Sequence, residues 1–247
     1  MELSSHIKNL LKRNPGVARP ILRVIRKSGF NVGTGIELPE ALLSYFGINN
    51  IFDVGANTGQ YAERTRILGY EGKIVSFEPV TAAFYELEKK AENDPRWITR
   101  NFGLGDYDGE TWINVSENTL HCSMLDPLPR LGKTYPDAIY VAKEQVNVYK
   151  IDSIFNDYFE AGDKVLLKID AQGYEKWVLE GARSSLNIIG LQLELSLIPH
   201  YEGALPMIEI VNLLSEKGYT LVWLSPLAHN FKMDYLTEAD GMFFRLS

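Results

Sequence analysis

The chain has 247 residues, 45% of them hydrophobic and 23% charged, which is enough for one large domain or two small ones with a real core. Its single cysteine, Cys122, excludes an internal disulfide framework and a cysteine-based zinc site, and it fits a reducing, cytoplasmic compartment. The net charge of −7 argues against nucleic acid as the main partner, because an acidic body repels phosphate backbones.

Residues 1–35 are predicted to form a basic helical extension. Residues 1–30 carry seven Lys and Arg residues against Glu2, a balance of +6 that leaves −13 on residues 31–247. Apolar residues recur there at helical spacing and are interrupted at "NPG", which predicts two short helices. Two interpretations stay open: the helices pack on the domain, or they contact anionic lipid or a partner protein and make the protein peripheral to the membrane.

No stretch of the chain has the pattern of a membrane span or a signal peptide. The longest apolar runs are too short or too interrupted to cross a bilayer. The N-terminus lacks an uninterrupted apolar core and a small-residue cleavage site. We therefore expect a cytoplasmic protein.

Residues 36–247 are predicted to form one α/β domain. Short apolar runs alternate with helical patterns, which predicts a Rossmann-like, mostly parallel sheet with helices on both faces. The last two strands follow each other without a helix, so the sheet is expected to be mixed, with an antiparallel edge strand. The expected helices are 37–47, 58–70, 81–93, 174–186 and 207–218, and the expected strands are 50–54, 72–79, 97–105, 164–170, 188–196, 219–225 and 241–247.

The alternation of strands and helices breaks between about residues 106 and 150, where we predict an insertion. The stretches 109–116 and 144–152 alternate polar and apolar residues, which is typical of half-buried antiparallel strands. Residues 117–143 between them are rich in turn residues and too long for a plain connection, so we expect a functional loop.

A glycine-containing turn, "DVGANTGQY", follows the strand at 50–54. Asp53 ends the strand, Gly55 lets the backbone approach a ligand, and Gly59 lies where a helix begins. The dinucleotide fingerprint needs a second glycine where Asn57 stands, and an acidic residue before the glycines would repel a pyrophosphate. The turn therefore favours a methionyl group, with its ammonium, over a nicotinamide dinucleotide.

Further carboxylates follow neighbouring predicted strands. Glu78 ends the strand in "IVSFEP", where an acidic side chain accepts hydrogen bonds from ribose hydroxyls. Asp170 ends a strongly apolar strand, and a buried carboxylate needs a partner or a ligand. Glu194 is expected beside Asp170 at the same edge of the sheet. Glu175 opens the next helix, where the helix dipole alone explains an acidic residue.

Taken together, the motifs "DVGANTGQY", "SFEP", "NFGLGD", "VNVYKIDS", "LLKIDAQGYEKWVLEGA" and "LELS" resemble the FkbM-type S-adenosylmethionine-dependent methyltransferases over roughly residues 48–225. The resemblance implies a class I methyltransferase fold and O-methylation of a hydroxyl on a sugar, glycan, glycolipid or related natural product. By the motif match, the cofactor-binding residues would be Asp53, Gly55, Ala56, Asn57 and Gly59 at the methionyl end, Glu78 and Pro79 at the ribose, Asn101, Phe102 and Gly103 along the adenine, and Asp170 near the transferred methyl.

A hydroxyl acceptor is a poor nucleophile, so a general base is expected. The catalytic candidates are Asp170, Glu194, His121 in the long loop and His200 after the Glu194 strand. Asp170 and Glu194 could instead bind Mg²⁺, which would lower the pKa of a bound hydroxyl. A binding protein on a degenerate fold is the alternative, since a fold does not imply activity. The sequence does not give the identity of the acceptor or the oligomeric state.

Overall fold

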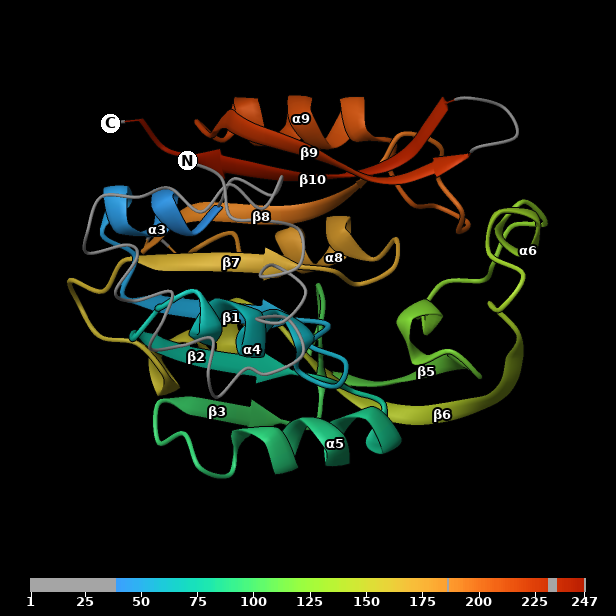
Figure 1. The fold of residues 1–247 in the computed structure, drawn as a ribbon, viewed down its shortest axis with the longest axis horizontal. Coiled ribbons are helices and arrows are strands. Elements are labelled where there is room, and N and C mark those ends of the chain that lie inside the picture. Colours follow the sequence, from blue (N-terminus) through green and yellow to red (C-terminus); the bar gives the residue numbers. More distant parts are fainter. Residues whose placement is uncertain (1–38, 186, 231–234, 247) are drawn as a thin grey trace, which may run out of the picture.

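The computed structural model describes residues 39–185, 187–230 and 235–246. The helices predicted within residues 1–35 lie outside these ranges, so the division into an extension and a domain stays a prediction. The centre of the molecule is a seven-stranded sheet (Figure 1). Its strands are β1 (Asn50–Val54), β2 (Lys73–Phe77), β3 (Trp97–Arg100), β7 (Val165–Ile169), β8 (Ile188–Ser196), β9 (Thr220–Asn230) and β10 (Tyr235–Phe244).

The strand order is β3-β2-β1-β7-β8-β10-β9, and the strands from β3 to β8 all pair in parallel. Chain order reverses at β1, which pairs with β2 on one side and β7 on the other. Ligands of such sheets bind outside the carboxyl ends of the strands at this reversal. The predicted class I methyltransferase fold is confirmed.

We expected the antiparallel strand at the edge of the sheet, but it is the second strand from the edge. β10 pairs antiparallel with β8 and with β9, which leaves β9 at the edge. The burial of the two strands follows this order. Most residues of β10 are buried, Phe243 and Phe244 completely, whereas Leu224 and Leu227 of β9 remain exposed.

Helices cover both faces of the sheet, as predicted. Leu43, Ala62 and Leu87 belong to one core cluster on one face, and Phe155, Val178 and Ile210 to another on the opposite face. The helices of the first face are α3 (Pro39–Phe46), α4 (Gln60–Ile67) and α5 (Thr81–Ala91). Those of the second are α7 (Ile151–Ile154), the 3-10 turn η2 (Phe155–Asp157), α8 (Glu175–Glu180) and α9 (Met207–Glu216).

A second sheet of three strands lies beside the carboxyl ends of β2 and β1 (Figure 1). It has the order β4-β6-β5, with β4 (Gly103–Leu104) parallel to β6 (Tyr140–Tyr149) and β5 (Gly109–Ser116) antiparallel to β6, the antiparallel pairing that we predicted. The single strand predicted at 97–105 is therefore wrong. The chain leaves the main sheet after Arg100 and enters the second sheet at Gly103.

Between β5 and β6 the chain crosses the carboxyl edge of the main sheet as residues 117–139, which we call the strap. It contains the 3-10 turn η1 (Thr119–His121) and the short helix α6 (Leu131–Thr134). Backbone hydrogen bonds fix it to the loop after β8: the Leu128 amide donates to the His200 carbonyl at 2.8 Å, and the Glu202 amide donates to the Asp126 carbonyl at 2.9 Å. The strap therefore roofs the edge where a ligand is expected.

Candidate active site

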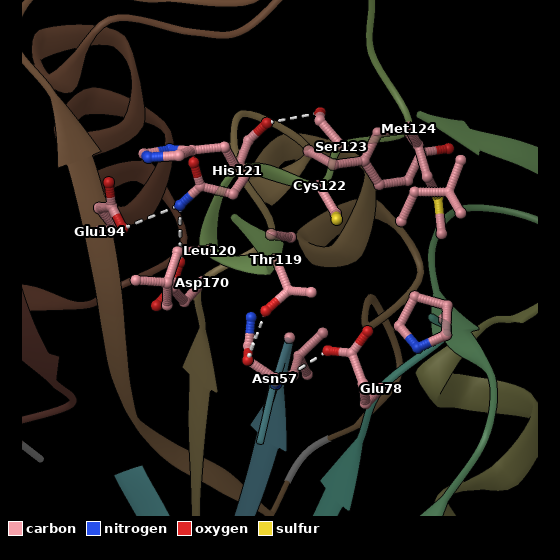
Figure 2. Close-up of a pocket in the computed structure, with 18 of the residues that line it drawn as sticks. Asn57, Glu78, Thr119, Leu120, His121, Cys122, Ser123, Met124, Asp170 and Glu194 are labelled. Carbon is pink, nitrogen blue, oxygen red and sulfur yellow. Dashed lines mark hydrogen bonds between the residues drawn. The ribbon is translucent and has the colours of Figure 1, made fainter. Parts of the chain in front are cut away.

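A cavity of about 330 Å³ lies between the strap and the carboxyl edge of the main sheet (Figure 2). Residues near the carboxyl ends of β2, β1, β7 and β8 and near the start of the antiparallel β10, five neighbouring strands, contribute to its wall. Figure 2 shows Glu78 and Glu194 on opposite sides, with Asn57 and Asp170 between them and the strap residues Thr119 and His121 above. Neighbouring strands lie about 4.8 Å apart, so the cavity crosses roughly 19 Å of the edge.

The turn after β1 is built for close approach. Gly55 has φ 70°, and a Cβ added there would lie 1.8 Å from the carbonyl oxygen of Asp170. Only glycine fits this cradle. Asn57 also has a positive φ, 48°, and its backbone amide donates to Glu78 Oε2 at 2.8 Å. The Thr119 hydroxyl lies 3.2 Å from Asn57 Oδ1, so the strap rests on this turn.

Glu78 is a buried carboxylate held by two backbone amides. Its Oε2 accepts from Asn57 and its Oε1 accepts from Val80, each at 2.8 Å. Burial raises the pKa of Glu78 to about 7, although these two hydrogen bonds and Lys168 oppose the shift. The carboxylate lines the cavity with a fixed orientation and can accept hydrogen bonds from a diol.

We predicted that Asp53 would face the cavity, but in the structure it does not. It is fully buried behind the wall, where its carboxylate accepts from the Ser76 hydroxyl at 2.9 Å and pairs with Lys168 Nζ at 3.1 Å. Burial lowers the pKa of Lys168, but the charges of Asp53 and Asp170 outweigh it and leave that pKa raised. The direct contact predicted between Asp53 and a methionyl ammonium is therefore not what the structure shows. Asp53 supports the site through Lys168.

The other predicted cofactor residues divide into two groups. Pro79 and Gly103 line the cavity. Ala56 and Gly59 lie on the face of the main sheet that α4 covers. A Cβ added at Gly59 would lie 2.9 Å from the Trp97 ring. These two residues shape the turn rather than the wall.

Asn101 and Phe102 also lie outside the wall. The Asn101 amide donates to the carbonyls of Glu78 and Pro79, at 2.9 and 3.1 Å, and so holds the chain after β2. Phe102 packs on Phe77, with ring centroids 5.4 Å apart. We predicted that these two residues contact a ligand. In the structure they instead support residues that line the cavity.

The turn after β7 joins two of the predicted carboxylates. Asp170 lines the cavity, and the side-chain amide of Gln172 donates to Asp170 Oδ1 at 3.1 Å and to Glu194 Oε2 at 3.3 Å. The Tyr201 hydroxyl donates to Gln172 Oε1 at 3.1 Å. Glu175 faces away from this group and accepts from the backbone amides of its own turn, in agreement with a structural role.

Glu238 of β10 joins this group from a distant part of the sequence. It lines the cavity beside Glu194 and accepts a hydrogen bond from the Tyr135 hydroxyl of the strap. Burial, followed by the charges of Asp170 and Glu238, raises the pKa of Glu194 well above its usual range. Burial also raises the pKa of Glu238. Burial therefore disfavours the charged form of both carboxyls.

The two histidine candidates are placed differently. His121 lines the cavity from the strap, and burial lowers its pKa, so the imidazole is neutral near pH 7. His200 is 2% exposed and lies behind the wall, with its Nε2 3.7 Å from Glu238 Oε1 and its ring packed edge-on against Tyr135. We predicted that His200 would reach a ligand in the cavity. From its position behind the wall it does not.

Sequence reasoning missed Lys168, Gln172 and Glu238 as members of this site. Lys168 had a usable signal, because a lysine inside the buried strand "VLLKI" requires an anionic partner. Glu238 had none, because its place depends on the pairing of β10 with β8.

Nothing in the structure supports the predicted Mg²⁺ site. Among the residues that the structure describes, no group of three or more His, Cys, Asp and Glu side chains is arranged to hold a metal ion. The same part of the chain contains no helix that is both long enough and apolar enough to cross a membrane.

Comparisons with known proteins identify a family for this chain. The methyltransferase FkbM domain matches residues 53–221, and no curated protein matches. Among solved structures, the methyltransferase FkbM from Methylobacillus flagellatus KT is 16% identical with a TM-score of 0.47, covering 80% of this chain and 43% of its own. The magnesium protoporphyrin IX methyltransferase from Synechocystis, with bound S-adenosylmethionine, is 11% identical with a TM-score of 0.43, covering 98% and 85%.

Proposed function

The chain belongs to the FkbM methyltransferase family, and we propose that it transfers a methyl group from S-adenosylmethionine to a hydroxyl of a sugar, glycan or related natural product. The observation that carries this proposal is one continuous cavity with a glycine cradle at Gly55, a diol acceptor at Glu78 on one side, and the carboxyls of Asp170 and Glu194 on the other.

The half of the cavity formed by β2, β1 and the second sheet fits the methyl donor, and we call it the donor half. Glu78 is placed to bind the ribose hydroxyls. Leu104, Ile113 and Met124 form apolar walls suited to an adenine ring. The carboxylate of Asp170, near the centre, favours the positive charges of the methionyl ammonium and the sulfonium. These residues fit S-adenosylmethionine by the chemistry of their groups.

When bound, S-adenosylmethionine supplies a methyl group on a positively charged sulfur. The protein then has to align the acceptor oxygen with that methyl, and alignment alone accounts for much of the acceleration of such reactions. The strap covers the cavity and keeps water from the reacting atoms. Asp170, held by Gln172 beside the cradle, keeps negative charge at the centre of the cavity.

We assign the general base to His121. Its imidazole lines the cavity and is neutral near pH 7 because burial lowers its pKa, so it can accept the hydroxyl proton. Glu194 is a weaker choice because burial raises its pKa and so disfavours the deprotonated form that a base needs, and His200 lies behind the wall.

Tritium transfer from labelled S-adenosylmethionine to a panel of glycosides tests this assignment. We expect His121→Gln to lower kcat by about 10²–10⁴-fold, the usual contribution of a base. A base works only when deprotonated, so the wild-type rate should fall as pH drops below a value lower than about 6.5, and His121→Gln should lose this limb. The control is Glu117→Gln on the same strap, which leaves the cavity wall intact. An unchanged pH profile in His121→Gln would contradict the role.

Calorimetry separates the proposed activity from the alternatives. A methyltransferase binds S-adenosylhomocysteine tightly and does not bind NAD. A binding protein on the same fold would bind a ligand but transfer no label to any member of the panel. Absence of S-adenosylhomocysteine binding would remove the proposal.

A further inference from the structure

The half of the cavity at β8 and β10, which we call the acceptor half, holds Glu194, Glu238 and Tyr135. Among the described residues it has carboxyl groups, a phenol and the imidazole of His121, but no Lys or Arg. Among the described residues that line the whole cavity there is no Lys or Arg, whereas four carboxyl groups line it: Glu78, Asp170, Glu194 and Glu238. The nearest lysine, Lys168, is buried behind the wall and is engaged by Asp53 and Asp170.

The groups of the acceptor half are arranged to exchange hydrogen bonds with a ligand. The Tyr135 hydroxyl donates to Glu238, and Gln172 donates to Glu194, so each carboxyl has one partner in place and can form further hydrogen bonds. The exposed side chain of Leu227 forms part of the wall beside them. A ligand that offers several hydroxyl groups matches such a surface, since each hydroxyl both donates and accepts.

An independent observation points to a missing partner at this place. His200 is 2% exposed, and neither of its ring nitrogens has a hydrogen-bond partner in the described residues. Its Nε2 faces Glu238 Oε1 at 3.7 Å, too far for a hydrogen bond. A buried polar group without a partner is costly, and a hydroxyl bound at Glu238 would let this carboxyl turn toward the imidazole.

We propose that Glu194, Glu238 and Tyr135, backed by His200, form a subsite for the hydroxyl groups of an uncharged polyol and that this subsite rejects anionic acceptors. The inference rests on the proposed function, because it names the substrate class of the same cavity. A phosphate or a uronate carboxylate would bring negative charge next to Asp170 and the two glutamate carboxyls, and none of the described residues that line the cavity is a Lys or an Arg that could neutralise it.

A cationic acceptor fits less well than a neutral one. Burial raises the pKa of both glutamates and so disfavours their charged form, which weakens the attraction of the subsite for a cation. Burial, followed by the charge of Arg130, lowers the pKa of His200, so a positive charge lies near the back of the subsite. The carboxyl and phenol groups instead offer hydrogen-bond donors and acceptors, which hydroxyl groups use best.

The test is a charge-sorted transfer assay. The purified full chain is incubated with tritium-labelled S-adenosylmethionine and an equimolar mixture of methyl hexosides, methyl hexuronides, hexose 6-phosphates and 2-amino-2-deoxyhexosides, and the products are separated by ion exchange. We expect the neutral fraction to hold at least about 100-fold more label than the anionic fraction, since like-charge juxtaposition costs several kcal/mol. Most label in the anionic or cationic fraction, or none in any fraction from a protein that binds S-adenosylhomocysteine, overturns the subsite.

A matched pair of variants ties the preference to Glu238. Glu238→Gln should raise the KM for the best neutral hexoside by about 10-fold or more, as expected for loss of a buried hydrogen bond to a carboxyl, with S-adenosylhomocysteine affinity unchanged. Glu202→Gln, an exposed glutamate in the loop after β8, should behave as wild type. If Glu238→Gln does not fold, Tyr135→Phe provides the same comparison. An unchanged KM in the folded variant overturns the subsite, whereas failure of the wild type to bind S-adenosylhomocysteine would instead overturn the proposed function.

Discussion

The donor half and the acceptor half of the cavity share one sheet edge but are built in opposite ways. In the donor half, the turns after β1 and β2 are 21 residues apart in the sequence, and Glu78 is fixed by the amides of Asn57 and Val80. In the acceptor half, residues from β8, β10 and the strap meet, and Glu194 and Glu238 are crowded side chains with raised pKa values. Backbone hydrogen bonds therefore fix the geometry of the donor half, whereas side-chain contacts fix that of the acceptor half.

This difference has a functional consequence. A half fixed by backbone hydrogen bonds and a glycine cradle tolerates little change, which suits a cofactor that never varies. A half made of side chains that belong to separate elements can change one residue at a time. We infer that acceptor specificity is encoded in the β10 and strap residues, whereas donor binding is encoded in the turns after β1 and β2.

The largest effect should come from Lys168, which joins the two halves by pairing with Asp53 behind the donor turn and with Asp170 at the centre. Lys168→Met leaves the buried Asp53 carboxylate without its counter-ion, which should lower the free energy of unfolding by about 3–5 kcal/mol. Urea denaturation followed by circular dichroism measures this. Lys164→Met, an exposed lysine next to the same strand, should change stability by no more than about 0.5 kcal/mol.

A second variant separates charge from packing in this pair. Combining Lys168→Met with Asp53→Asn removes the buried charge and should recover part of the loss. If the double variant is as unstable as Lys168→Met alone, the ion pair is not the cause of the instability.

The next largest effect should fall on the donor half alone. Gly55→Ala forces a Cβ to within 1.8 Å of the Asp170 carbonyl and strains a residue with φ 70°. We expect a loss of stability of about 3 kcal/mol from overpacking and strain together, with loss of measurable S-adenosylhomocysteine binding by calorimetry. The control is Gly132→Ala in α6, where an added Cβ meets nothing within 4 Å. If Gly55→Ala bound S-adenosylhomocysteine as tightly as the wild type, the turns after β1 and β7 could move apart without loss of binding.

The smallest effect should be confined to the acceptor half. Tyr135→Phe removes the hydroxyl that donates to Glu238 and leaves the ring packed against His121 and His200. Loss of one hydrogen bond to a carboxyl is worth about 1–2 kcal/mol, so the acceptor KM should rise about 10-fold at constant S-adenosylhomocysteine affinity. Tyr85→Phe on the exposed face of α5 serves as the control. A parallel loss of S-adenosylhomocysteine binding would show that the two halves are not independent.

The sequence by itself determined the bounds of several strands that carry the site. β1 and β5 of the donor half and β8 of the acceptor half have the predicted bounds, because apolar runs between turn residues are local patterns. Gly55, Asn57, Glu78 and Asp170 were placed at the cavity for the same reason, since parallel strands bring their carboxyl ends to one edge.

Only the tertiary structure decided which side chains meet. That Asp53 pairs with Lys168, and does not face a ligand, depends on the register of β1 against β7, which pairs the two residues across the strands. The acceptor half needs β10 to insert beside β8 and the strap to carry His121 and Tyr135 across the edge. These are long-range pairings fixed by packing of whole elements, and no local spacing of residues records them.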